Sequence, residues 1–99
     1  MTQSTDIVEF QSDWYQTASL EEQQQFRDWL LTLLDTKPAV KIQFKKANGE
    51  NRSMMCTTKN APAVESRRIS NTVCTVWDIE KHDWRSFKFE NITNIDFQL

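Results

Sequence analysis

This 99-residue chain is poor in the residues that interrupt elements or bind metals, with one glycine, two prolines, two cysteines and one histidine. Long apolar runs are missing as well. The longest, WLLTLL at 29–34, falls well short of the roughly 20 residues that a membrane-spanning helix needs, so we expect no membrane association. The start MTQSTDIVEF has neither the basic residues nor the apolar block of a secretory signal, which favours a cytoplasmic protein.

The scarcity of cysteine and histidine limits the possible chemistry. Cys56 and Cys74 show no paired metal-ligand spacing, and each lies in a β-like run, so we expect two core thiols rather than a disulfide. His82 stands in an expected turn, without the ligands of a zinc site or the nucleophile of a catalytic triad. No glycine-rich phosphate loop is present. The sequence therefore predicts a protein that is not an enzyme and holds no metal or cofactor.

Bulky aromatic residues are well represented, with four Trp and six Phe in a chain whose hydrophobic fraction is 38%. Each buried aromatic removes about 150 to 250 Å² from water. A chain of this length hides roughly 60 to 70% of its unfolded surface. We therefore expect one domain over residues 1–99.

Charge divides the chain into two unlike parts, although the formal net charge is only −2. Residues 1–36 carry seven acids and one base, and residues 37–99 carry eleven bases and seven acids. The whole-chain charge thus conceals two electrostatically different segments. We interpret them as an acidic helical segment at 1–37 and a β-rich segment at 38–99.

A helix is predicted to begin at the capping-box sequence SLEE, where Ser19 and Glu22 satisfy each other's backbone amides. It should end before Pro38, because the residue before proline is pushed out of helical geometry. The expected buried stripe consists of Phe26, Trp29, Leu30, Leu33 and Leu34. Leu20 and Leu31 fall outside this stripe and need another cover. A short preceding helix with Phe10 and Trp14 one turn apart is one candidate.

The period changes to two after the proline, and alternation over 39–45 predicts a half-buried strand. A turn around Asn48-Gly49 follows. A two-residue turn is one option; a three-residue loop with Gly49 in the left-handed position instead pairs Phe44 with Arg52. We choose the second register because it keeps Met54 on the buried face.

Further strands are predicted at 72–79 and 84–92, joined by the turn EKHD, and the chain ends in ITNIDFQL. The expected core residues at the end are Ile92, Ile95 and Phe97. Residues 57–71 contain Pro62 and are expected to form a loop. The fold class is therefore α+β: an N-terminal helix or helix pair, then four or five strands in a small antiparallel barrel that closes its edges.

The stretch VWDIEKHDWRSFKFENI resembles the end of WYL-type domains, which finish in a pattern close to R-x-F-R-x-D-R-I. The hairpin VKIQFKKANGENRSMMCT falls where the opening strands lie in a short WYL-like family of phage and bacterial proteins. The likeness covers residues 38–97 and implies an Sm-like SH3 β-barrel. Arg85, Phe87 and Ile92 match the pattern, while Lys88, Glu90 and Asn91 replace Arg, Asp and Arg. In WYL domains the basic positions help to bind nucleotides or oligonucleotides.

Two interpretations remain open for Arg85, which shares a strand face with Phe87. In the first, the aliphatic part of the Arg85 side chain packs on the core and its guanidinium pairs with a carboxylate such as Asp78 or Glu80. In the second, the guanidinium binds an anionic ligand, and a nearby tryptophan stacks on a base. The candidate ligand-binding residues are Arg85, Lys88, Trp84, Trp77, Lys41, Lys45 and Arg52.

The basic residues of the hairpin and the following loop also allow two explanations. They are Lys41, Lys45, Lys46, Arg52, Lys59, Arg67 and Arg68. They serve solubility and protect an edge strand, or they follow a phosphate backbone, in which case single strands suit them better than a duplex.

Two functions follow from these patterns. The first is a non-catalytic binding module of phage-like origin that binds nucleotides or single-stranded nucleic acid through the barrel. The second is a protein-interaction or accessory module, acting through the acidic amphipathic helix and the barrel edge, with another protein or a second copy as partner. Packing of the helix on its own barrel is the plain alternative to the second function.

Overall fold

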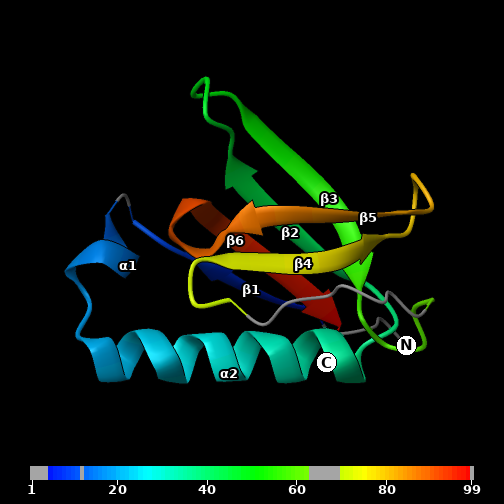
Figure 1. The fold of residues 1–99 in the computed structure, drawn as a ribbon, viewed down its shortest axis with the longest axis horizontal. Coiled ribbons are helices and arrows are strands. Elements are labelled where there is room, and N and C mark those ends of the chain that lie inside the picture. Colours follow the sequence, from blue (N-terminus) through cyan, green and yellow to red (C-terminus); the bar gives the residue numbers. More distant parts are fainter. Residues whose placement is uncertain (1–4, 12, 63–69, 99) are drawn as a thin grey trace.

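The computed structural model describes residues 5–11, 13–62 and 70–98 (Figure 1). Their order is β1 (Thr5–Glu9), α1 (Trp14–Thr17), α2 (Leu20–Thr36), β2 (Val40–Lys45), β3 (Asn51–Thr57), β4 (Val73–Asp78), β5 (Asp83–Lys88), the 3-10 turn η1 (Phe89–Asn91) and β6 (Ile92–Gln98). The strands form one antiparallel sheet in the order β1-β6-β2-β3-β4-β5. The predicted α+β architecture, with two helices ahead of most strands, is confirmed.

Helix α2 begins and ends where its sequence signals predict. The Glu22 amide donates to Ser19 Oγ at 3.1 Å, and the Ser19 amide donates to Glu22 Oε1 at 3.2 Å, which completes the capping box. The helix stops at Thr36, two residues before Pro38. Leu30, Leu33 and Leu34 of the predicted stripe are buried, whereas Trp29 is 39% exposed.

The β2–β3 hairpin has the predicted three-residue-loop register. Phe44 lies opposite Arg52, Ile42 opposite Met54 and Val40 opposite Cys56. Gly49 has φ +88°, a conformation that costs glycine little and other residues more. The inward side chains of this hairpin are therefore the ones that alternation assigned to the core.

The sheet bends sharply between β3 and β4, which pair only through Cys56 with Asp78 and Thr57 with Trp77. The β4–β5 hairpin consequently crosses over β2, β3 and β6, while α2 lies along one side of the sheet (Figure 1). The core residues between these layers include Val40, Ile42, Phe44, Cys56, Cys74, Val76, Phe87, Phe89, Ile92 and Ile95. Among the described residues no ladder joins β1 to β5, so the expected closure of the barrel by hydrogen bonds is not seen.

Four expectations need correction. The segment before α1 contains a strand, β1, which pairs with β6 and raises the number of strands in the described ranges to six. The run 84–92 is not one strand, because it turns at η1 and places Phe89 in the core with 1% exposure. Leu20 is 83% exposed rather than covered. Phe10 lies outside α1 (Trp14–Thr17), yet its ring stacks on Trp14.

Both cysteines are buried and form no disulfide, as predicted. Burial raises the pKa of the Cys56 thiol, and nearby Cys74 and Asp78 add to the effect. His82 is exposed in the β4–β5 turn, also as predicted. In the part of the chain that the structure describes, no helix has the length and hydrophobicity to span a bilayer.

Candidate anion-binding site

A hollow of about 720 Å³ opens between the β2–β3 turn and the end of β5. We call it the basic concavity, after the cationic side chains that line it: Lys45, Lys46, Arg52, Arg85 and Lys88. Among the described residues of its lining, Glu90 is the one carboxylate. Four of the five cations were predicted as ligand-binding residues. The structure brings them together from strands that lie far apart in the sequence.

Strand pairing explains why the two arginines meet here. Residues opposite each other on paired strands point to the same face of a sheet. Arg52 therefore shares the face of Phe44, and Arg85 shares the face of Val76. Phe44 and Val76 are buried, so both guanidinium groups stand on inward faces at the rim of the core.

The floor of the basic concavity is apolar. The rings of Phe44 and Phe87 stack with centroids 5.3 Å apart and an interplanar angle of 19°. They are 8% and 5% exposed, and Met54 beside them is 5% exposed. Charges above an apolar floor act through a lower effective dielectric than charges surrounded by water, which strengthens their attraction for an anion.

Among the described residues, the ion pair of Arg85 is long and exposed. Arg85 Nη2 lies 4.0 Å from Asp83 Oδ2, with the two side chains 46% and 64% exposed. Exposed pairs of this kind contribute little. The expected carboxylate Asp78 is instead buried, and its Oδ1 accepts from the amides of Glu80 and Lys81, each at 3.0 Å.

Three predicted residues do not line the basic concavity. Trp77 and Trp84 form a cross-strand pair, with ring centroids 5.7 Å apart, on the other face of the β4–β5 hairpin from Arg85. Lys41 is on β2 opposite Met55, on the face away from Ile42. Arg67 and Arg68 lie outside the described residues.

The sequence analysis named Lys46 among the basic residues of the hairpin but not among the candidate ligand-binding residues, and it did not predict the apolar floor. The signal for the floor was present in the hairpin register, because pairing Phe44 with Arg52 puts a cation beside a core aromatic. Asn91, which also lines the hollow, falls there because the chain turns at η1, and the strand pattern did not predict that turn.

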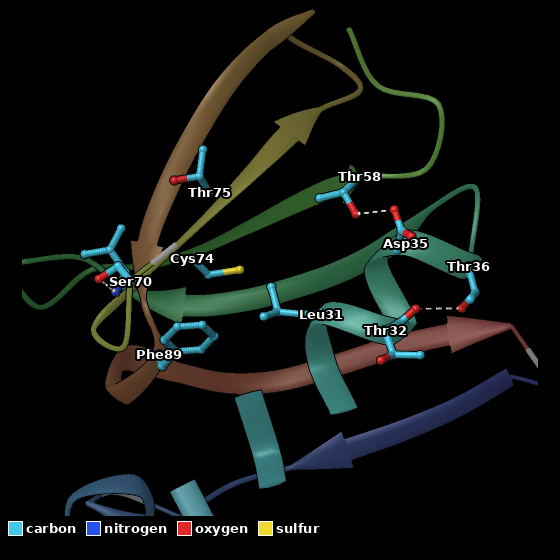
Figure 2. Close-up of a pocket in the computed structure, with 10 residues that line it drawn as sticks. Leu31, Thr32, Asp35, Thr36, Thr58, Ser70, Cys74, Thr75 and Phe89 are labelled. Atoms are coloured by element: carbon cyan, nitrogen blue, oxygen red, sulfur yellow. Dashed lines mark hydrogen bonds between the residues drawn. The ribbon is translucent and has the colours of Figure 1, made fainter. Parts of the chain in front are cut away.

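A second hollow, of about 540 Å³, lies between α2 and the start of β4 (Figure 2). Two of its hydroxyl groups have partners within the protein: Thr36 Oγ1 donates to the Thr32 carbonyl at 2.9 Å, and Thr58 Oγ1 donates to Asp35 Oδ1 at 3.4 Å. No cation belongs to its described lining, which includes the partly buried Leu31. This hollow is therefore poorly suited to an anion. Over the described ranges no cluster of three or more potential metal ligands occurs either.

The bent six-stranded sheet and its core place the protein among small domains of the SH3-like barrel class. The chain belongs to the WYL_2 family, described as having an Sm-like SH3 beta-barrel fold, whose model matches residues 27–93. The match contains the whole basic concavity and begins inside α2, earlier than the resemblance at 38–97 implied. Comparisons with curated proteins and with solved structures found no match.

Proposed function

We propose that the protein is a non-catalytic module that binds nucleotides or single-stranded nucleic acid in the basic concavity. One observation carries the proposal: five cations from two separate hairpins line a single hollow in a protein whose formal net charge is −2. Scattered surface charges that serve solubility alone have no reason to converge in this way.

The cations suit phosphate groups. Arg52 and Arg85 offer planar forks that bind phosphate oxygens in pairs, and the lysines offer point charges. Lys88 takes the place of an arginine in the WYL-type pattern, so it keeps the charge without the fork. Each phosphate neutralised on a single strand lowers log K by about 0.7 per unit of log salt.

The size and floor of the hollow favour a nucleotide or an unpaired strand over a duplex. Small-ligand pockets occupy roughly 300 to 1,000 Å³, and the basic concavity has about 720 Å³. An apolar floor beneath a basic rim is an arrangement that accepts an unstacked base together with its phosphate.

Fluorescence anisotropy tests the proposal with labelled DNA and RNA single strands of about ten nucleotides, at about 50 and about 200 mM salt. Unlabelled AMP and ATP serve as competitors. The test variant carries Arg85→Ala and Lys45→Ala together. The matched control carries Lys59→Ala and Lys81→Ala together, which removes the same charge outside the basic concavity.

The first pair should weaken binding by roughly tenfold or more, and the matched pair by less than about twofold. Competition by the mononucleotides would identify a nucleotide site, and resistance to them a site for strands. Absence of binding at low salt, or an equal loss in both pairs, would remove the proposal.

A further inference from the structure

A third hollow differs from the basic concavity in its chemistry, because aromatic rings line it. This hollow of about 710 Å³ is formed where the end of β1, helix α1 and the first half of α2 meet. Four aromatic side chains line it: Phe10, Trp14, Phe26 and Trp29. We call it the aromatic groove. Most of it is built from residues before 27, outside the part of the chain that the family model matches.

The walls of the aromatic groove are held in place by contacts with the sheet. The Trp14 indole Nε1 donates to the Ile92 carbonyl at 3.2 Å, and the Phe10 amide donates to the Thr93 carbonyl at 3.0 Å. The Phe10 and Trp14 rings stack with their centroids 4.1 Å apart. The Phe26 and Trp14 rings form a T-shaped pair with their centroids 4.5 Å apart. The rings therefore form a preformed surface, and preformed surfaces bind at lower entropic cost.

Acidic residues are frequent in the segment that forms the aromatic groove. Glu22 lines the aromatic groove directly. Exposed acids also flank its lining residues along the chain, at Glu9, Asp13, Glu21 and Asp28. The one base within residues 1–36 is Arg27, whose Nη1 donates to the Tyr15 hydroxyl at 2.6 Å. The segment that forms the groove thus carries a negative net charge, with Glu22 in the lining itself, which favours a positively charged occupant.

We infer that the aromatic groove docks a cationic peptide segment of a partner protein, one that carries an apolar anchor between lysine or arginine residues. The anchor fills the ring-lined hollow. The flanking cations meet the aromatic rings and the carboxylates together, because a cation gains from a π face and from a nearby acid. Trp29 is 39% exposed, so among the four aromatic side chains of the groove it has the most surface to bury on docking.

A second copy of this chain is a poorer occupant on the same grounds. Its richest cationic segment, the hairpin tip KKANGENRS at 45–53, contains no large apolar side chain to act as an anchor. Arg52, the one arginine of this segment, lines the basic concavity instead.

The probe for the test is a labelled peptide of about ten residues that alternates lysine and leucine, followed by fluorescence anisotropy. Two control peptides replace the leucines by serine or the lysines by glutamate. In the protein, Trp29→Ala removes an aromatic wall, and Leu20→Ala is the matched control. Leu20 is 83% exposed on the same helix and does not line the groove. Circular dichroism checks that each variant folds.

We expect Trp29→Ala to weaken peptide binding roughly tenfold or more, as interface aromatics do, and Leu20→Ala to weaken it less than about twofold. Glu22→Gln, which keeps a capping side chain, should weaken it by a few-fold. The serine and glutamate peptides should bind far less. Arg85→Ala with Lys45→Ala should leave peptide binding unchanged, so that this inference and the proposed function fail independently.

Three results would overturn the inference. The first is absence of binding by the lysine–leucine peptide to the unmodified protein. The second is equal binding of the serine peptide, which would mean charge attraction alone. The third is concentration-dependent self-association that Trp29→Ala abolishes, because the occupant would then be a second copy.

Discussion

The stacked pair Phe44 and Phe87 supports both the core and the floor of the basic concavity, so its energetics test the described packing. Both rings are nearly buried and lie 5.3 Å apart. Truncating a buried phenylalanine to alanine costs about 3 to 5 kcal/mol, which we expect for Phe87→Ala. Beyond burial, an aromatic pair contributes about 0.5 to 1.5 kcal/mol.

A double-mutant cycle isolates that pair term. Urea unfolding of the unmodified protein, Phe44→Leu, Phe87→Leu and the double variant, followed by tryptophan fluorescence, should give a coupling free energy in that range. Ile42→Ala should cost about 2 to 5 kcal/mol, and Lys41→Ala, on the outward face, within about 0.5 kcal/mol. A coupling near zero, or a small and equal loss in all the alanine variants, would refute the packing argument.

Other predictions concern the cap, the turn and the buried thiol. Ser19→Ala should cost about 1 kcal/mol of unfolding free energy by removing the N-cap. Because hydrogen bonds with Ser19 lower the pKa of Glu22, the capping advantage should be present above the ordinary glutamate pKa. This advantage should shrink as the pH falls through the lowered pKa of Glu22. The melting temperatures of the unmodified protein and of Ser19→Ala should then converge. Gly49→Ala should cost about 1 kcal/mol in urea unfolding, a purely conformational penalty, since no atom lies within 4 Å of an added Cβ; a loss several times larger would mean a clash. Cys56 should resist iodoacetamide in the folded protein and react on unfolding, because burial raises its pKa; labelling in native buffer would contradict its burial.

Local signals in the sequence were enough to predict the parts of the fold that depend on near neighbours. The capping box and Pro38 determine where α2 begins and ends. The single glycine selects the loop that pairs Phe44 with Arg52, and alternation then determines which side chains face the core. These features involve residues only a few positions apart, so pattern reasoning reaches them.

The missed features depend on contacts across the whole chain. The five residues of β1 become a strand because β6, which pairs Gln98 with Thr5 more than ninety positions away, supplies their hydrogen bonds. The turn at η1 depends on burying Phe89 beneath the helices, where Tyr15 stacks on it at 6.2 Å. The alternation of residues along one strand does not indicate which distant segment will pair with it or pack on it.

The candidate site shows the same division. Its cations were recognisable by type, and alternation placed Arg85 on the strand face of Phe87, which is where the structure has it. Alternation did not show that the two hairpins turn toward each other, because the sheet bends where β3 and β4 share only two residue pairs. That bend brings Arg52 and Arg85 to one hollow and leaves Lys41 and both tryptophans outside it.

The most direct test of the central claim is a titration of the ¹⁵N-labelled protein with a short single-stranded oligonucleotide, followed by amide chemical shifts. The claim is that the basic concavity is where an anionic ligand binds. The largest shifts should fall on residues 44–54 and 85–91, which together line it. Shifts concentrated around Lys41, Trp77 and Trp84, or no shifts at low salt, would contradict it.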